Sequence, residues 1–281
     1  MNEIRLPQGV IRYRDTGQGP VVVLVHGLLV DGRLWDGVVE ALAPRHRCIV
    51  PDLPLGAHEV PLEPAADRTP AGVAALVADF LDALDLRDVT LVGNDTGGAL
   101  CQWVAARRPE RIGRLVLTPC DTHENFLPPM FRPLQWLARV PALVVPVTMP
   151  LRLRPLRRLP IAFGWLAKRP RPDVEQDWID RFFANPGARR DAVTFLAAID
   201  KSFTRELARE LESFAKPALV AFATDDKVFP PANGERLARA MPDARFERIE
   251  DSYAFAPVDR PRRVAELIEG FVRESQPVGA H

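Results

Sequence analysis

The residues best suited to chemistry form a six-residue motif, Gly-Asn-Asp-Thr-Gly-Gly at 93–98, directly after the apolar run 89–92. An acidic residue between small ones after a strand is the pattern of a nucleophile elbow, a strained strand-to-helix turn that holds one side chain above a sheet. Glycines are needed because strand and helix approach too closely for a Cβ. The presented side chain is Asp95, whose carboxylate suits displacement at an sp³ carbon and would form an ester intermediate.

This elbow resembles that of the α/β-hydrolases, whose esterases carry Ser where this chain has Asp95. The aspartate is similar to that of the Asp-nucleophile branch, which includes haloalkane dehalogenases and epoxide hydrolases. The resemblance implies an α/β fold with a doubly wound, mostly parallel sheet and a helical cap inserted after the sixth strand. It also implies an enzyme that acts on a small apolar substrate through nucleophilic Asp95.

A second part of the resemblance is His26-Gly27, which ends the apolar run 21–25 and precedes Leu28. In the family, the amide after His-Gly and the amide after the nucleophile form the oxyanion hole. The resemblance therefore implies that the amides of Leu28 and Thr96 stabilise negative charge. We expect His26 to hold this loop by hydrogen bonds rather than to take part in catalysis.

The segment 218–230 resembles the strand and loop that carry the acid of the family's catalytic triad. In that loop the aspartate stands four residues before a proline, which selects Asp226 over Asp225. The order along the chain, nucleophile first and acid later, is also that of the family. The alternative is that Asp226 is an exposed acid in a turn.

The histidine base of the triad is missing. Aligning 252–261 with the family's segment before the last helix puts Ala254 at the histidine position, and no histidine occurs from residue 124 to residue 280. Tyr253 also replaces the usual glycine, which favours natural divergence over an engineered histidine-to-alanine trap. The first displacement needs no base, whereas the water that hydrolyses the ester must be deprotonated. Efficient hydrolytic turnover is therefore not expected without a substitute.

His123 is the possible substitute base, since it lies in the loop after the predicted strand 114–118, at the sheet edge where ligands bind in such folds. In some haloalkane dehalogenases the triad acid comes from this loop, so Asp121 and Glu124 are alternative acids. His58, in the loop after residue 51, is a weaker candidate for the base.

Neither named activity transfers residue by residue. Haloalkane dehalogenases place a halide-binding Trp directly after the nucleophile and commonly Asn after His-Gly, where this chain has Thr96 and Leu28. Epoxide hydrolases use cap tyrosines to protonate the opening ring, but the only tyrosines here, Tyr13 and Tyr253, lie outside the expected cap.

Two other classes of function stay open. A non-hydrolytic enzyme, such as an isomerase, lyase or cyclase, would use Asp95 as a general base. The oxyanion-hole amides argue against this, because they are expected to stabilise the charged carboxylate and make it a weak base. The other class is a catalytically silent homologue that only binds a ligand. The sequence identifies neither the substrate nor the leaving group.

The pattern of apolar residues predicts the elements that position these groups. The predicted strands are 9–14, 21–25, 47–51, 89–92, 114–118, 218–223 and 244–249, and the predicted helices are 36–43, 69–84, 98–107 and 263–273. Their alternation indicates a parallel, doubly wound sheet. A proline-dense stretch breaks the alternation, so we expect a core of 1–126 and 206–281 and a helical cap at 127–205.

Apolar and aromatic residues of the expected cap should partly line a substrate pocket, about a quarter of them facing substrate. They are Phe131, Leu134, Trp136, Leu137, Phe163, Trp165, Trp178, Phe182, Phe183 and Phe195. The pocket residues that we predict individually are Trp35, Phe126, Trp136 and Phe255.

The composition excludes several other classes. Lys and Arg total 37, as do Asp and Glu, so the net charge gives no reason to expect nucleic acid as a partner. A local cluster of Arg152, Arg154, Arg157, Arg158 and Lys168 reads as a solvated face. Three cysteines without C-x-x-C spacing suggest neither a disulfide framework nor a zinc site. No signal peptide or membrane-spanning run is evident. We expect a cytoplasmic monomer or homodimer with no cofactor, no metal and no membrane partner.

Overall fold

The computed structural model describes residues 1–275, which form an eight-stranded sheet in the order β1-β2-β4-β3-β5-β6-β7-β8. The strands are β1 (Asn2–Leu6), β2 (Gly9–Thr16), β3 (Val21–Val25), β4 (Arg47–Pro51), β5 (Val89–Asp95), β6 (Ile112–Cys120), β7 (Ala218–Ala223) and β8 (Ala244–Ile249). The strands from β4 to β8 in this order run parallel, and β1 and β2 extend the sheet antiparallel. The predicted α/β fold is confirmed. The sequence interpretation missed only β1 among these strands.

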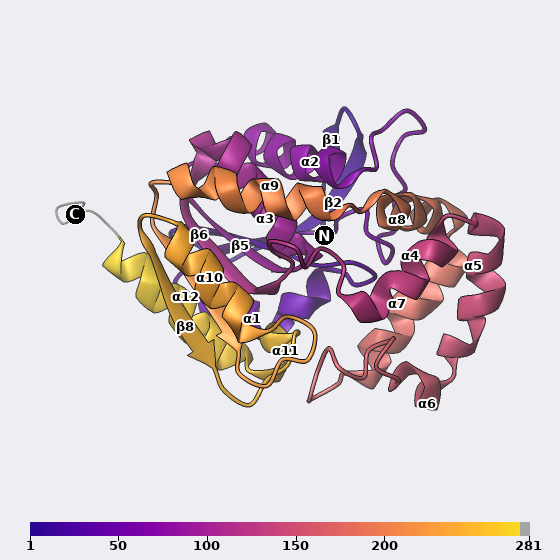
Figure 1. Cartoon of the computed structure of the whole chain (residues 1–281). Helices are drawn as coiled ribbons and strands as arrows, with labels where there is room; N and C mark the ends of the chain where they lie inside the picture. The colour runs from indigo at the N-terminus through magenta and orange to yellow at the C-terminus, as the bar shows by residue number, and fades with distance from the viewer. Residues whose placement is uncertain (276–281) are drawn as a thin grey trace.

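Helices cover both faces of the sheet (Figure 1). On one face lie α2 (Pro70–Ala83), α3 (Thr96–Arg107) and α9 (Lys201–Glu210), and on the other lie α1 (Asp36–Leu42) and α12 (Pro261–Glu274). The remaining core helices are α10 (Pro231–Ala240) and α11 (Ala256–Asp259), and short 3₁₀ helices are η1 (Gly32–Trp35), η2 (Pro109–Arg111), η3 (Pro129–Phe131), η4 (Met149–Arg152) and η5 (Leu211–Ser213).

Local sequence explains why these elements form. The central strand β5 is buried over six of its seven residues, which suits the apolar run of a parallel strand covered on both faces. The helix α2 begins at a Thr69 cap, whose hydroxyl accepts a hydrogen bond from the Gly72 amide at 3.2 Å. Pro70 then occupies the first helical position, where its missing N–H costs nothing.

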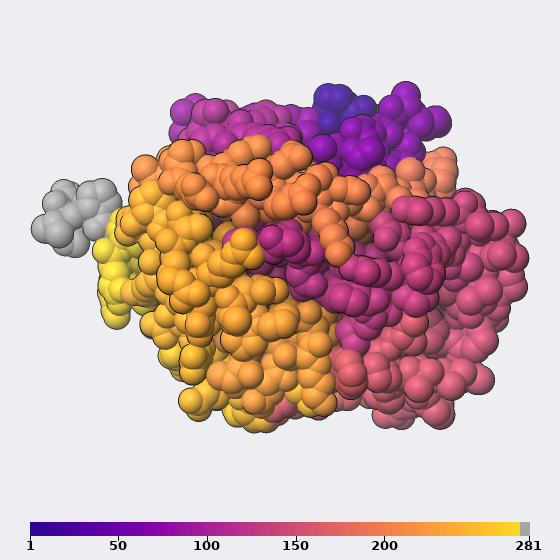
Figure 2. All heavy atoms as spheres, viewed as in Figure 1, coloured from indigo at the N-terminus to yellow at the C-terminus, as the bar shows by residue number. Residues whose placement is uncertain are grey.

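Between β6 and β7 the chain forms a separate group of helices. They are α4 (Arg132–Ala138), α5 (Pro141–Thr148), α6 (Arg154–Arg157), α7 (Pro172–Ala184) and α8 (Pro186–Ala198). Each has a proline in its first turn, where the ring is tolerated. We call residues 127–200 the helical segment. It lies beside the core and packs directly against it (Figures 1 and 2).

The end of the helical segment differs from the boundary expected at residue 205. The helix α9 runs unbroken from Lys201 to Glu210 and packs on α3, so its first turns lie with the core helices. Within residues 1–275, no helix combines the length and apolar composition needed to cross a bilayer.

Candidate active site

The turn that presents Asp95 is strained and crowded. Asp95 ends β5 and caps α3 with a φ of 56°, in the left-handed region that side chains other than glycine rarely adopt. Glycines surround it because no Cβ would fit: one added at Gly27 would lie 2.5 Å from the Cβ of Asp95, and one at Gly98 would collide with Cys120. The amide of Thr96 donates to the Asp95 carboxylate.

The carboxyl group of Asp95 is held by amides yet disfavours charge. Burial raises its pKa, while the Thr96 amide, which donates to the carboxylate, and the nearby Leu28 amide lower it, and the net shift is upward. Of the two amides expected around Asp95, that of Thr96 donates to it, and a hydrogen bond from the Leu28 amide stays a prediction. The prediction that these amides lower the pKa of Asp95 and make it a weak base is wrong in direction, because burial raises the pKa by more than the amides lower it.

His26 is fully buried, and its ring is bonded at both nitrogens. The Leu53 amide donates to Nε2 at 2.8 Å, so Nδ1 carries the proton that bonds the Gly27 carbonyl at 2.9 Å. Burial lowers the pKa of the ring, which keeps it neutral. These bonds tie the loop after β3 to the segment after β4 and support a structural role for His26.

Asp226 has one paired and one unpaired carboxyl oxygen. Its Oδ1 accepts from the amides of Val228 at 2.7 Å and Phe229 at 2.9 Å, whereas the buried Oδ2 has no hydrogen-bond partner among residues 1–275. Burial raises the pKa of Asp226 to about 7 despite these amides, and the charge of Asp95 raises it further. The two hydrogen bonds to Oδ1 fix the carboxyl group, and Oδ2 can accept a hydrogen bond from another group.

Ala254 is fully buried next to the elbow. The side-chain amide of Asn94, the residue before Asp95, donates to the Ala254 carbonyl at 2.9 Å, and the Phe255 amide donates to the Leu166 carbonyl at 2.6 Å. The bond from Asn94 holds Ala254 at the carboxyl end of β5, and its match to the histidine position of the family stays a prediction from the sequence. A methyl group there offers no proton acceptor.

Asp121 lies close to Asp95 because β5 and β6 pair side by side, with Asp95 opposite Cys120. The Asp121 side chain is buried, and its oxygens accept from the Leu127 amide at 2.9 Å and the Thr96 hydroxyl at 3.3 Å. Burial and the nearby charge of Asp95 raise the pKa of Asp121 well above its usual value. The carboxyl group therefore favours its protonated form.

The other two candidates in this loop are directed elsewhere. His123 is buried with its Nδ1 3.1 Å from the Thr122 hydroxyl, and it does not line the cavity beside Asp95. Glu124 is exposed and pairs with Arg236 at 2.9 Å. Of the three residues considered from the sequence, only Asp121 shares a cavity with Asp95.

Two adjoining cavities, of about 80 and 90 Å³, lie between the core and the helical segment. The first, which we call the Asp95 cavity, is lined by Asp95, Thr96, Asp121 and Leu28 with apolar residues of the helical segment. The second, the apolar cavity, lies mostly within the helical segment and contains one polar side chain, Thr148. The lining residues common to both are Leu29, Leu134, Leu151, Phe163 and Leu196.

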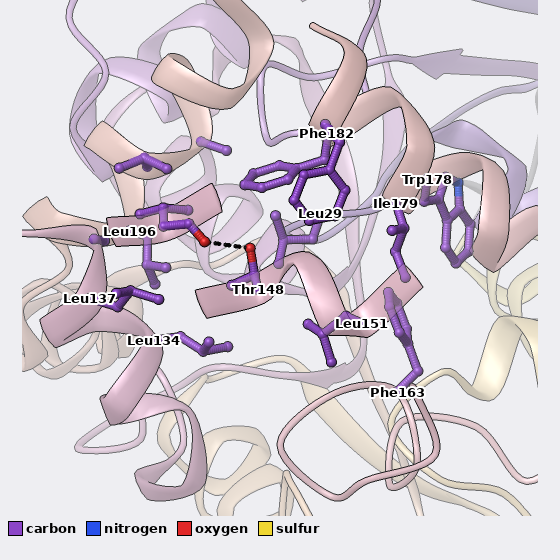
Figure 3. Close-up of a pocket in the computed structure, with 15 residues that line it drawn as sticks. Leu29, Leu134, Leu137, Thr148, Leu151, Phe163, Trp178, Ile179, Phe182 and Leu196 are labelled. Carbon is purple, nitrogen blue, oxygen red and sulfur yellow. Dashed lines mark hydrogen bonds between the residues drawn. The ribbon is translucent and has the colours of Figure 1, made fainter. Parts of the chain in front are cut away.

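Figure 3 shows the apolar cavity, where leucine and aromatic side chains from several helices converge. The Thr148 hydroxyl donates to the Val144 carbonyl of its own helix at 2.6 Å, so it is already paired. The joined cavities therefore offer hydrocarbon surface at one end and two carboxyl groups at the other. Among residues 1–275, no three His, Cys, Asp or Glu side chains gather as metal ligands would.

The four residues predicted individually for the pocket line neither cavity. Trp35 and Phe255 are buried in the core, Phe126 stacks on Phe203 at 5.3 Å between ring centroids, and Trp136 is 62% exposed. The broader prediction, that about a quarter of the apolar and aromatic residues of the cap face substrate, stays a prediction. Seven of the ten expected residues line one cavity or the other: Phe131, Leu134, Leu137, Phe163, Trp178, Phe182 and Phe183.

Comparisons with known proteins agree with this architecture. Residues 20–261 match the family model described as alpha/beta hydrolase fold. The chain is 28% identical to an uncharacterized protein of Mycobacterium tuberculosis, over 94% of this chain and 79% of that protein. It is 35% identical to a haloalkane dehalogenase of Mesorhizobium japonicum, over 44% of this chain and 41% of that protein.

Among solved structures, a thermophilic esterase from Thermogutta terrifontis superposes with a TM-score of 0.79 and 22% identity, covering 99% of this chain and 100% of that one. At that identity the likeness concerns the fold alone. Together with the family match over most of the sequence, these findings show that the chain belongs to the alpha/beta hydrolase fold family.

Proposed function

We propose that this protein is an enzyme in which Asp95 attacks an elongated apolar substrate and forms an ester, without the usual histidine base. The observation that carries the proposal is the position of Asp95. It stands on a strained turn, accepts a hydrogen bond from the Thr96 amide, and lines a cavity that adjoins a second, apolar one. Holding a carboxylate in place against a reacting carbon lowers the barrier by proximity and orientation.

In the proposed first step, a carboxylate oxygen of Asp95 forms a bond to carbon, and the leaving group departs with the bonding electron pair. Neither residue used by haloalkane dehalogenases for halide is present, since Thr96 and Leu28 occupy those positions. An oxygen leaving group, as in a strained cyclic ether or lactone, fits better, because it can take a proton from a neighbouring acid.

We assign this proton to Asp121, which lines the same cavity and favours its protonated form. As the carbon–oxygen bond breaks, Asp121 gives its proton to the departing oxygen and becomes a carboxylate. It then accepts one proton from the water whose oxygen bonds to the ester carbonyl carbon. The bond from that carbon to the alkyl oxygen breaks, the alkoxide takes the second proton of the water, and Asp95 is released as a carboxylate. Asp121 thereby returns to its starting state, and the cycle balances without histidine.

The raised pKa of Asp95 supports a second candidate, in which it acts as a general base in an isomerase, lyase or cyclase. This role requires transfer of a proton from substrate carbon to Asp95, with no covalent intermediate. A third possibility is a homologue that binds an apolar ligand without turnover. The two enzymatic candidates predict different masses for the protein during reaction.

The test uses a long-chain terminal epoxide and a 1-iodoalkane, with intact-protein mass spectrometry and peptide mapping. We expect one adduct per protein, on the peptide that carries Asp95, and no adduct in Asp95→Asn. The epoxide adduct should turn over slowly in wild type. In Asp121→Asn it should form more slowly, because the acid is lost, and then persist, because the base is lost as well. No adduct but deuterium uptake from solvent into product would favour the general base. Saturable ligand binding with neither signal would favour the silent homologue.

A further inference from the structure

The helical segment carries nearly all the exposed large apolar side chains of the described chain. Eight such side chains are 40–62% exposed across residues 1–275, and seven of them lie between residues 136 and 159. The exception is Met1. We call the seven the apolar ridge: Trp136, Val140, Leu143, Val147, Met149, Leu153 and Leu159. The elements that carry or adjoin these residues, α4, α5, η4 and α6, pack one against the next, and a large exposed apolar patch usually marks a binding surface.

Within the ridge, α5 is apolar on both sides. Its Val144 is buried and lines the apolar cavity, whereas Leu143 is 49% and Val147 58% exposed. The adjacent pair Trp136 and Leu137 on α4 divides in the same way, with Leu137 lining the cavity and Trp136 outside. A helix that is hydrophobic all round is normally buried on all sides. The inner face of α5 lines the apolar cavity, whereas nothing among residues 1–275 covers its outer face.

The charge of this region is one-sided. From residue 125 to residue 172 the chain has nine Arg and Lys residues and no Asp or Glu, although the whole protein is neutral. Some of these cations pair with acids outside the stretch, as Arg152 does with Asp180. Arg139 and Arg154 are exposed and form no ion pair within residues 1–275. The ridge is therefore bordered by uncompensated positive charge.

We propose that the apolar ridge docks on the surface of an anionic lipid bilayer. Apolar side chains with an exposed Trp, flanked by arginines, match the interfacial region of such a membrane, where acyl chains lie beneath negative headgroups. A second copy of this chain fits less well, because a symmetric dimer through this face would bring its arginines together. The sequence expectation of no membrane partner rested on the lack of spanning segments, which peripheral docking does not need.

The proposal is independent of the chemistry of Asp95, and its test measures binding alone. Wild-type protein is sedimented with vesicles of phosphatidylcholine, alone or mixed with phosphatidylglycerol. We expect binding to the mixed vesicles that weakens as salt is raised, and little binding to phosphatidylcholine alone. Brominated lipids should quench part of the tryptophan fluorescence in wild type, and that part should be lost in Trp136→Phe.

Charge reversal gives the matched comparison. Arg139→Glu with Arg154→Glu should weaken binding to mixed vesicles by about tenfold or more. The control is Arg209→Glu with Arg262→Glu, which makes the same change of net charge at exposed arginines on α9 and α12. It should alter binding by less than about twofold, because salt screens charges that lie far from the bilayer. Circular dichroism checks the fold of each variant.

Three results would overturn the proposal. One is no sedimentation of folded wild type with either vesicle. Another is equal loss in both pairs of charge variants, which would indicate attraction by net charge alone. The third is a dimer in sedimentation velocity that Trp136→Ser with Leu153→Ser abolishes, without vesicle binding, which would assign the ridge to a second copy.

Discussion

At the scale of residues, the proposal depends most on Ala254, which the sequence places at the histidine position of the family, because a missing base would affect only the second step. Asp95 accepts a hydrogen bond from the Thr96 amide, and Asp226 keeps one carboxyl oxygen that has no hydrogen-bond partner among residues 1–275. Backbone amides hold both carboxyl groups, so neither group needs an imidazole to keep its position. A site built this way can keep its first step while the second depends on another group.

We expect Ala254→His with Tyr253→Gly to speed hydrolysis of the Asp95 ester, since Asp226 can orient the new ring. General-base assistance is typically worth about 10²–10⁴-fold, so partial restoration is measurable. The added ring enters a fully buried position, and overpacking costs about 1–3 kcal/mol, which is why Tyr253 is shortened as well. The measurement is single-turnover decay of the adduct, with Tyr253→Gly alone as the control.

Faster decay in the histidine variant that is unchanged by Asp226→Asn would contradict the assigned orienting role. Wild-type turnover abolished by His123→Ala would instead show that the base lies in the loop after β6, and that Asp121 is not the proton carrier.

The sequence predicted the features of the site that lie within short stretches of the chain. The elbow and the absence at residue 254 lie in short motifs, so the sequence alone indicated them. The sequence offered Asp121 and Glu124 alike as acids in the loop after β6, and it could not tell which one approaches Asp95, because that depends on the register in which β6 pairs with β5. Nor does the sequence show that burial raises the pKa of Asp95 by more than the surrounding amides lower it.

At the scale of elements, the predictions succeeded where the periodic signal was strong. The predicted helix 69–84 corresponds to α2 (Pro70–Ala83), and 263–273 to α12 (Pro261–Glu274). The strand β1 was missed because it is a short, mostly exposed edge strand, paired with β2 alone. The aromatic residues of the pocket were misassigned because residue type does not tell which face of a short helix turns inward, as Trp136 and Leu137 illustrate.

The elbow gives a prediction about close packing. Gly27→Ala should lower the free energy of unfolding by about 1–3 kcal/mol and abolish adduct formation, since the new methyl group would overlap the Asp95 side chain. Gly270→Ala is the matched control, because Gly270 lies in α12 with no atom within 4 Å of an added Cβ. It should raise stability by about 0.5–1 kcal/mol through helix propensity. Urea unfolding and adduct mass measure both effects, and normal adduct formation in Gly27→Ala would contradict the crowded geometry.

At the scale of the whole molecule, the helical segment is tied to the core by a buried ionic network. Asp191 of α8 accepts from Arg68 Nε at 2.6 Å and from the Leu62 amide at 2.7 Å, and its carboxylate lies 3.3 Å from His58 Nε2. The Asp191 side chain is fully buried and that of Arg68 nearly so. His58, considered from the sequence as a base, is thus a partner of this carboxylate and lines neither cavity.

The network predicts how the segment responds to mutation and acid. Asp191→Asn should lower the free energy of unfolding by about 3–5 kcal/mol near neutral pH, because Arg68 would stay buried without a counter-charge. Its hydrogen bonds hold the pKa of Asp191 at about 2, below the usual 3.8. A lowered carboxyl pKa stabilises the fold above the unfolded value, and this stabilisation is lost as pH falls from about 4 toward 2. The difference between wild type and variant should therefore narrow at low pH.

Asp180→Asn is the matched control, since Asp180 lies in the same segment but pairs with Arg152 at the surface, with half of the Arg152 side chain exposed. Exposed pairs contribute about 0–1 kcal/mol, so this variant should change little at either pH. The measurement is the urea midpoint of the three proteins at pH 7 and pH 3. A loss in Asp191→Asn as small as in Asp180→Asn would mean that apolar packing alone holds the segment. A difference from wild type that stays equal at both pH values would mean that the carboxylate charge of Asp191 is not what stabilises the contact.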